Sequence, residues 1–119
     1  MDRNKTGKDA EIHAERFLSK NKLTLVERNY HCRFGEIDLI MLDRRTLVFI
    51  EVRYRNSKKY GGAAASVTAT KQRKIIKAAQ HYLSHKTQFS NNNCRFDVIA
   101  YEYDAAPTKP LWYKDAFRT

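Results

Sequence analysis

The sequence is short of cysteine and has no long apolar run, and each shortage excludes a class of protein. Its two cysteines, Cys32 and Cys94, have no CxxC spacing and form no zinc pattern with the four histidines. A disulfide-stabilised scaffold is therefore excluded, and free thiols fit a reducing compartment. The first residues, MDRNKTGKDAEIHAERFL, lack the apolar run of a signal peptide, and no later run is long enough to span a bilayer. We therefore expect a cytoplasmic protein without a membrane partner.

Acidic residues are also scarce relative to basic ones. There are 13 Asp and Glu against 23 Lys and Arg, which gives a formal net charge of +10. With 119 residues, 42% of them hydrophobic, the chain is able to bury one core and fits one domain over residues 1–119. A small, basic, folded domain predicts a polyanionic partner, with nucleic acid as the leading candidate. A basic protein without such a partner is the alternative that charge alone leaves open.

Hydrophobic periodicity predicts two helices and at least four strands. Residues 6–20 and 68–86 carry apolar side chains at helical spacing. Alternating or apolar runs predict strands at residues 23–32, in a hairpin over 35–55, at 94–103 and, as a short edge strand, in LWYKDAF near the end. The segments NSKKYGGAAASV and TQFSNNN are expected to be loops. The order αβββαβ predicts an α/β fold, with a mixed β-sheet flanked by helices in a single domain.

The hairpin GEIDLIMLDRRTLVFIEVRYR places acidic residues among apolar ones. With its turn centred on Arg44 and Arg45, the symmetric register pairs positions whose numbers sum to 89. Asp38 then lies opposite Glu51, and Glu36 lies opposite Arg53. One face is expected to be wholly apolar, built from three pairs: Ile37 with Val52, Leu39 with Ile50, and Met41 with Val48. Facing carboxylates with Cβ atoms roughly 5 Å apart destabilise a sheet, so a cation or a proton must offset their repulsion.

Two interpretations of Asp38 and Glu51 follow. Mg²⁺ favours one or two carboxylates with water and phosphate oxygens as its other ligands, and it activates water against a phosphodiester. The alternative is a charged end of the sheet, in which basic neighbours neutralise the acids. Candidates for that role, besides the Glu36–Arg53 pair, are Arg33, Arg55 and Lys71.

Several segments resemble a known family: TGKDAEIHAERFL, RNYHCRFGEIDLIMLD, LVFIEVRYR, GGAAASVTATKQRKI and RFDVIAYE. Together they resemble the bacterial YraN family, which is similar in turn to archaeal Holliday-junction resolvases and to the PD-(D/E)xK nuclease superfamily. The resemblance covers almost the whole chain. It implies a restriction-endonuclease-like domain that acts on DNA, including branched DNA, with Mg²⁺ or Mn²⁺. It also implies a homodimer, for which the sequence itself shows no interface.

The resemblance assigns a role to individual acidic residues. Asp38 matches the first metal-binding aspartate of the superfamily, and Glu51 matches the acidic residue of its (D/E)xK motif. Glu11, in the Gly-x-x-x-Glu pattern that begins at Gly7, matches a first-helix glutamate that joins the metal site in resolvase-like members. Glu11, Asp38 and Glu51 are therefore the expected metal ligands.

Arg53 departs from the motif, which has lysine at this place. An arginine can position water or stabilise negative charge, but it cannot act as a base because a guanidinium stays protonated. Lys71, in the first turn of the second helix, is the expected substitute. A cation there opposes the helix dipole and so calls for a carboxylate or phosphate nearby, and a solvated lysine is the alternative. The expected catalytic residues are therefore Asp38, Glu51, Arg53 and Lys71.

Other side chains are expected to contact nucleic acid through phosphate pairing or base stacking. These are Arg55, Lys58, Lys59, Tyr60, Arg73 and Lys74. Asp97 is expected to pair with Arg95 rather than join the site. His81 and His85 have ligand-pair spacing on a helix, but no third ligand lies beside them.

Two functions from different classes remain. One is a Mg²⁺- or Mn²⁺-dependent endonuclease acting on DNA, which the resemblance favours over RNA as the partner. The other is a non-catalytic module of the same fold that binds nucleic acid or protein, which the arginine in place of the motif lysine favours. RNA or ribosome association is a third option that the basic charge permits.

Overall fold

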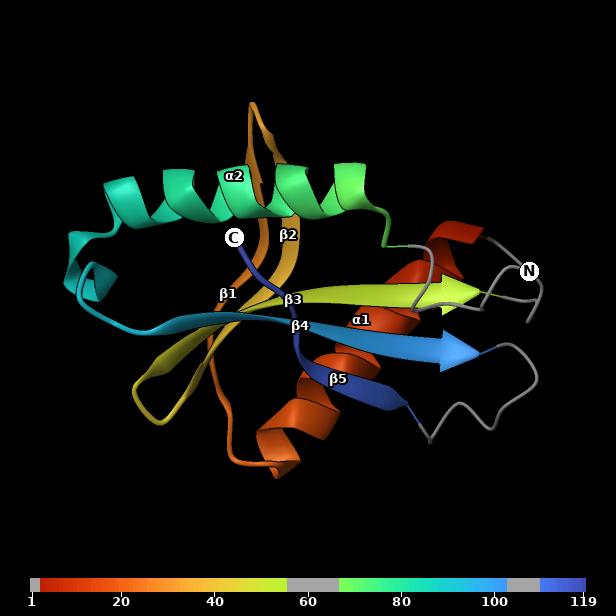
Figure 1. Ribbon diagram of the computed structural model, residues 1–119. Coiled ribbons are helices and arrows are strands. Elements are labelled where there is room, and N and C mark those ends of the chain that lie inside the picture. Colours follow the sequence, from red (N-terminus) through yellow and green to blue (C-terminus); the bar gives the residue numbers. More distant parts are fainter. Residues whose placement is uncertain (1–2, 56–66, 103–109) are drawn as a thin grey trace.

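A computed structural model describes residues 3–55, 67–102 and 110–119, which form a sheet between two long helices (Figure 1). The elements in chain order are α1 (Arg3–Lys20), β1 (Thr24–Cys32), β2 (Gly35–Asp43), β3 (Thr46–Arg55), α2 (Ala69–His85), the 3-10 helix η3 (Thr87–Phe89), β4 (Cys94–Glu102) and β5 (Leu111–Phe117). The predicted order αβββαβ and the added edge strand are confirmed. The first helix begins three residues earlier than expected, and η3 occupies part of a predicted loop.

The five strands follow one another in the order β1-β2-β3-β4-β5. The pairing of β3 with β4 is parallel, and the other three pairings are antiparallel. Parallel neighbours need a long crossover, which α2 provides between β3 and β4. The sheet is therefore mixed, as predicted.

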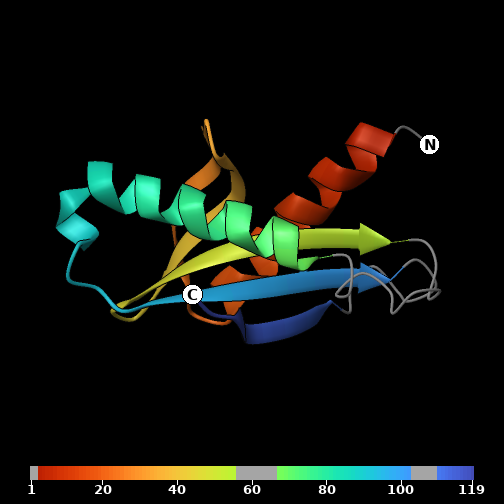
Figure 2. The same cartoon turned by 45° about the horizontal axis from the view of Figure 1, so that its top comes forward.

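The two helices cover opposite faces of the sheet, because alternate residues of the central strands point to opposite sides. Ala10, Ala14 and Leu18 of α1 pack with one set of strand residues, which includes Leu39, Met41, Val48 and Ile50. Ile75, Ala78, Ala79 and Tyr82 of α2 pack with the other set, which includes Ile40, Leu47 and Phe49. Figure 2 shows α2 lying along β3 and β4 while α1 crosses behind them. No helix within the described ranges is long and apolar enough to cross a membrane.

The hairpin of β2 and β3 has the predicted register, but only near its turn. Pairing runs from Asp43↔Thr46 to Leu39↔Ile50, and each pair sums to 89. Beyond Leu39 the strand β2 stays paired with β1, and both rise past α2 and away from β3 (Figure 1). The predicted pairings of Asp38 with Glu51, Ile37 with Val52 and Glu36 with Arg53 are therefore wrong, because the two strands have separated before these residues.

The predicted apolar face also changes at this point. Ile37 was expected on the same face as Leu39 and Met41. It packs instead with the residues of α2, whereas Leu39 and Met41 pack with those of α1. The alternation breaks opposite Asn29 of β1, whose φ of 50° lies in the left-handed region. Asn adopts that region more readily than most residues, so it allows the local twist that turns Ile37 to the other side.

Candidate functional site

Asp38 lies where β2 separates from β3, and its side chain replaces a main-chain partner. Its Oδ2 accepts a hydrogen bond of 2.8 Å from the backbone N–H of Val52. Burial raises the pKa of Asp38, and Glu36 raises it further, while the Val52 hydrogen bond and the charges of Lys71 and Arg53 act in the opposite direction. The Asp38 carboxylate is thus fixed in orientation and kept out of bulk water.

Glu51 is the more deeply buried of the two acids, with a residue exposure of 3%. Its Oε1 lies 3.4 Å from Nη1 of Arg53 and 3.9 Å from Nζ of Lys71. Its Oε2 is buried and has no hydrogen-bond partner among the described residues. Burial and then the charge of Asp38 raise the pKa of Glu51 to about 8, although Lys71 and Arg53 oppose the shift. One side of this carboxylate is therefore held by cations, and the other side lacks a partner.

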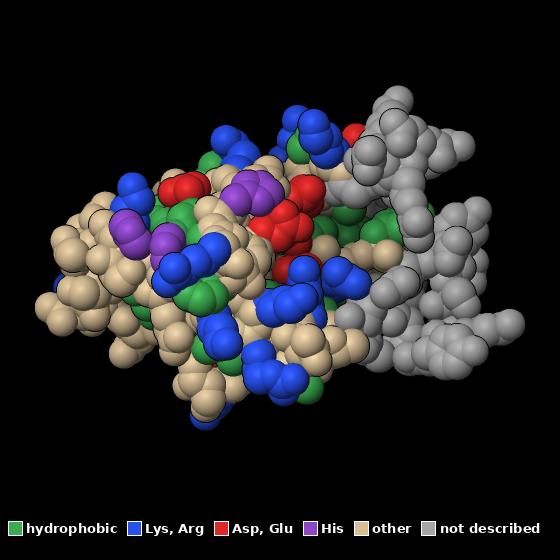
Figure 3. Space-filling view, turned by 90° about the horizontal axis from the view of Figure 1, so that it is seen from above, with side chains coloured by type: hydrophobic (Ala, Val, Ile, Leu, Met, Phe, Trp, Pro, Cys, Tyr) green, Lys and Arg blue, Asp and Glu red, His purple; other side chains and the backbone are tan. Residues whose placement is uncertain are grey.

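Glu11 brings a third carboxylate to the same region from α1. Burial raises its pKa to about 6, with further contributions from the charges of Asp38 and Glu36. Glu36 itself forms an ion pair with His31 across β1 and β2, with Nδ1 3.2 Å from Oε2. Figure 3 shows acidic side chains gathered on one face, beside a histidine and bordered by Lys and Arg. Acids that raise one another's pKa are therefore concentrated in one place on a basic protein.

The donor set of this region suits a hard divalent cation. Mg²⁺ and Mn²⁺ prefer carboxylate and water oxygens, and Mg²⁺ is held by as few as one or two carboxylates. Asp38 and the Oε2 of Glu51 supply those oxygens, and the absence of a partner on Oε2 leaves it available. Across the described ranges, no group of three or more His, Cys, Asp or Glu side chains is placed to hold a metal ion, so the structure does not bring Glu11 together with Asp38 and Glu51 as a three-residue site. The geometry therefore fits a water-rich site with two carboxylates rather than a cage.

Lys71 reaches Glu51 because of how α2 begins. Thr68 is the N-cap residue, and its Oγ1 accepts a hydrogen bond of 3.2 Å from the backbone N–H of Lys71. This fixes the first turn of α2 beside β3, with the Lys71 ammonium 3.9 Å from Glu51. The carboxylate neighbour expected for a lysine at this end of a helix is therefore present, and the solvated alternative is wrong.

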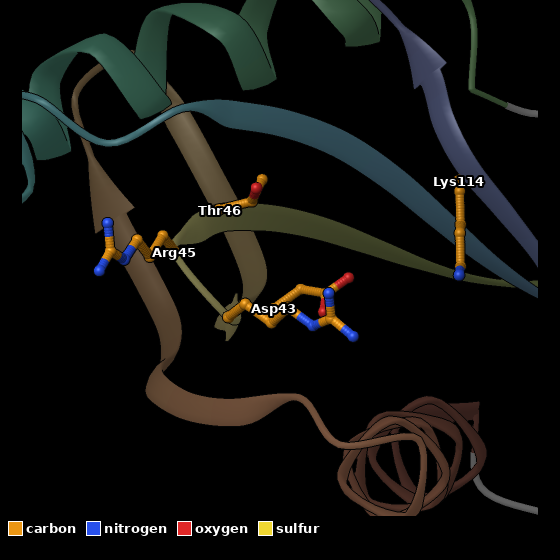
Figure 4. Close-up of a pocket in the computed structure, with 5 residues that line it drawn as sticks. Asp43, Arg45, Thr46 and Lys114 are labelled. Atoms are coloured by element: carbon orange, nitrogen blue, oxygen red, sulfur yellow. The ribbon is translucent and has the colours of Figure 1, made fainter.

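A hollow in the surface lies away from these acids, at the other end of β3 (Figure 4). Asp43, Arg44, Arg45 and Thr46 line it from the β2–β3 turn, and Lys114 lines it from β5. Thr46 and Glu51 are five positions apart on one strand, or about 17 Å. This hollow is shallow and open to solvent, and among the residues that line it only Asp43 is acidic. The region of Glu51 and Asp38 is therefore the better candidate site.

The family model described as "Uncharacterised protein family UPF0102" matches residues 10–101 of this chain. The chain belongs to this family. A UPF0102 protein of Alcanivorax borkumensis is 50% identical over 113 residues, covering 94% of this chain and 90% of the relative. One from Saccharophagus degradans is 57% identical over 97 residues, 82% of each chain. One from Pseudomonas syringae pv. syringae is 48% identical over 116 residues, 97% of this chain and 94% of the relative. The resemblance to the YraN family is thus confirmed as UPF0102 membership.

The nucleic-acid contacts predicted for this UPF0102 chain fall partly outside the structure. Lys58, Lys59 and Tyr60 lie outside the described residues, as does the side chain of Arg55. Arg73 and Lys74 lie exposed on α2, close in sequence to Lys71. Their contact with nucleic acid stays a prediction.

Asp97 proves to be a structural residue, as its predicted pairing indicated. It is fully buried, and its carboxylate accepts hydrogen bonds from Arg95 Nε at 3.0 Å, Trp112 Nε1 at 3.0 Å and the Asp115 backbone N–H at 2.9 Å. The sequence indicated the first of these contacts. It carried no signal for the other two, because they depend on where β5 docks.

Two histidine features also became visible only in the structure. His31 pairs with Glu36 beside the acids, and no sequence pattern indicated a role for it. His81 bonds the hydroxyl of Tyr30 through Nδ1, and His85 Nδ1 lies 2.9 Å from the His81 carbonyl oxygen. These contacts place His81 in the packing between α2 and β1, whereas the exposed His85 contacts only its own helix among the described residues.

Proposed function

We propose that this UPF0102 protein is an endodeoxyribonuclease that uses Mg²⁺ or Mn²⁺ to hydrolyse backbone phosphodiester bonds, including those of branched DNA. The observation that carries the proposal is the buried, unpartnered Oε2 of Glu51 beside the fixed carboxylate of Asp38. Two buried carboxylates repel each other, and the pKa values of both are raised. A divalent cation between them would offset this repulsion and satisfy Oε2.

The acidic residues would hold the ion. Glu51 Oε2 would be one ligand atom, since it has no hydrogen-bond partner among the described residues, and Asp38 Oδ1 would be the other, since Oδ2 accepts from Val52. Glu11 adds negative charge from the α1 side. A bound Mg²⁺ or Mn²⁺ supplies Lewis-acid polarisation of a phosphodiester and lowers the pKa of a water ligand.

The two basic residues at Glu51 would act on the phosphate. Arg53 and Lys71 both approach Oε1, so both are held at the edge of the carboxylate pair. A guanidinium stays protonated, which limits Arg53 to orienting the phosphate and stabilising the charge that develops on it. Lys71 takes the place that the family resemblance gives to the motif lysine, namely orienting water or stabilising the same charge.

The test is a nicking assay on linear and four-way-junction DNA with Mn²⁺. Asp38→Asn and Glu51→Gln should each reduce the rate about 100-fold or more, since each removes a charged ligand worth several kcal/mol. Asp9→Asn is the matched control, because Asp9 is an exposed acid of α1. Full activity in both site variants would disprove the assigned site.

A second candidate function is binding of nucleic acid without cleavage. It is favoured by Arg53 and Lys71, which already neutralise part of Glu51 without a metal. Calorimetric titration with Mn²⁺ separates the two candidates. The endonuclease proposal expects binding that Asp38→Asn weakens, whereas no Mn²⁺ binding by the wild-type protein would favour the non-catalytic module.

A further inference from the structure

The solvent side of α2 carries basic residues and no acidic ones. The 17 residues of this helix include Lys71, Arg73, Lys74 and Lys77, and none is Asp or Glu. Lys71 turns toward Glu51, whereas the other three are exposed. A cation in the first turn of a helix, here Lys71, opposes the helix dipole, and Lys74 and Lys77, three apart, repel each other. The fold therefore tolerates a local electrostatic cost on this surface.

The turn between β1 and β2 adds a further cation to the same surface. The Cα of Gly35 lies so close to α2 that a Cβ there would be 3.6 Å from Lys74 Cβ. The Phe34 ring lies 5.9 Å from that of His81, and the Arg33 guanidinium lies 4.8 Å from the centre of the Phe34 ring. On a helix, Lys74, Lys77 and His81 share one side. The exposed Arg33 is thus held beside the Lys74 and Lys77 side of α2.

Among the residues that the structure describes, these exposed cations have no acidic partner. Arg33, Lys74 and Lys77 form no ion pair within the described ranges, whereas Arg28, Arg95 and Arg118 are each paired with an acid. Glu36, the acid that follows Gly35 in the β1–β2 turn, is paired with His31. Figure 3 shows this face, with Lys and Arg around the central acids. A surface of unpaired cations next to a group of acids suits a polyanion that passes over both.

We propose that Arg33, Lys74 and Lys77, the basic track, hold the phosphate backbone of duplex DNA and lead it to the Glu51 region. This inference rests on the proposed function for the site at which the track ends. A helix of 17 residues is about 26 Å long, roughly three quarters of a duplex turn. Between Thr70 and Ser84, the exposed residues of α2 are Thr70, Arg73, Lys74, Lys77, Gln80 and Ser84, and none of them is aromatic. Polar and charged side chains contact backbone phosphates, whereas single-strand binding relies on aromatic stacking, so the surface favours a duplex.

The test compares two triple variants that lose the same charge. Arg33→Gln, Lys74→Gln and Lys77→Gln together remove the track and keep most of each side-chain stem. Arg16→Gln, Lys20→Gln and Lys22→Gln together remove three exposed cations from α1 and the following turn. Binding of a 30-base-pair DNA duplex is followed by fluorescence anisotropy over a range of NaCl concentrations, without divalent metal. Thermal melts check that both variants fold.

The track variant should bind at least about 10-fold more weakly than wild type, and its slope of log K against log salt should be shallower by about three. The α1 variant should keep the wild-type slope. Equal effects of the two variants, or an unchanged slope in the track variant, would overturn the inference. Tighter binding of a matched RNA duplex would overturn the choice of DNA.

Binding and cleavage fail separately in this design. If the track variant loses binding but wild type never nicks DNA, the track stands and the endonuclease proposal fails. If wild type nicks DNA and the track variant binds as wild type does, the endonuclease stands and the track fails.

Discussion

Glu51 is a carboxylate that the fold buries beside a second carboxylate, so its charge costs stability whenever no metal is bound. Two cations lie at Oε1, yet the pKa of Glu51 is still raised to about 8. Burial is the largest cause, because it removes water that would otherwise stabilise the charged form. The residue is therefore better suited to bind a cation than to stabilise the protein, which is the usual sign of a functional group.

This raised pKa predicts a pH dependence of stability. The folded protein holds the Glu51 proton more tightly than the unfolded chain, so the free energy of unfolding should fall as the pH rises through 8. For one proton, the free energy of unfolding changes by at most about 1.4 kcal/mol per pH unit. Without divalent ions, wild type should therefore lose about 2 kcal/mol between pH 6 and pH 8 relative to Glu51→Gln, measured by urea unfolding.

Added Mn²⁺ provides the control for this experiment. It should restore the stability of wild type at pH 8 and leave Glu51→Gln almost unchanged, because the variant has lost a ligand. If the free energies of unfolding of the two proteins change with pH in parallel without metal, ionisation of Glu51 does not destabilise the folded protein, and the prediction fails.

At the scale of secondary-structure elements, the sequence was most informative where local patterns act alone. Helical spacing predicted α2, and the alternating hairpin predicted the register from Asp43↔Thr46 to Leu39↔Ile50. The prediction was wrong beyond Leu39, because β2 follows β1 there. Asn29 in the left-handed region and the irregularity of β1 between Leu25 and Glu27 add twist that periodicity does not encode.

The candidate site was predictable to a similar degree. The nearness of Asp38 to Glu51 and the Lys71–Glu51 contact were predicted from the hairpin and from helix position, although Asp38 does not pair with Glu51 in the strand ladder. The hydrogen bond from Val52 to Asp38 could not be predicted, because it arises from the separation of β2 and β3. The docking of β5 could not be predicted either, because it depends on hydrogen bonds to the buried Asp97 of β4.

The attachment of β5 to β4 predicts the effect of changing Asp97. Its buried carboxylate accepts from Trp112 and from the Asp115 backbone, just where the pairing register shifts between Phe96 and Val98. Asp97→Asn removes the charge and leaves the half-buried Arg95 with Asp43 as its ion-pair partner. The free energy of unfolding, measured in urea, should fall by about 3 kcal/mol.

Asp115→Asn is the matched control for this substitution. Asp115 is exposed, and its carboxylate pairs only with the exposed Arg118. The control should therefore change stability by less than about 1 kcal/mol. An effect of Asp97→Asn as small as that of the control would remove Asp97 from the attachment of β5.

At the scale of the whole molecule, the net charge of +10 acts on folding and on binding with opposite sign. Repulsion among the cations destabilises the compact state, and added salt screens it. The same salt weakens DNA binding, because the counterions released on binding enter a more concentrated solution and their release is less favourable. In a protein that is basic only for solubility, added salt would stabilise the fold but would have no DNA binding to weaken.

Raising NaCl from 50 to 200 mM should therefore raise the melting temperature and lower DNA affinity. Self-repulsion of about 1 kcal/mol corresponds to a rise of about 4 °C, whereas four phosphate contacts correspond to a loss of affinity of about 100-fold. The triple variant with Arg16, Lys20 and Lys22 changed to Gln lowers the net charge by three without touching the basic track. It should show a smaller rise in melting temperature with salt but the same loss of affinity as wild type. If that variant and wild type differ in the salt dependence of binding, the charge that holds DNA is spread over the whole surface rather than concentrated on α2 and the β1–β2 turn.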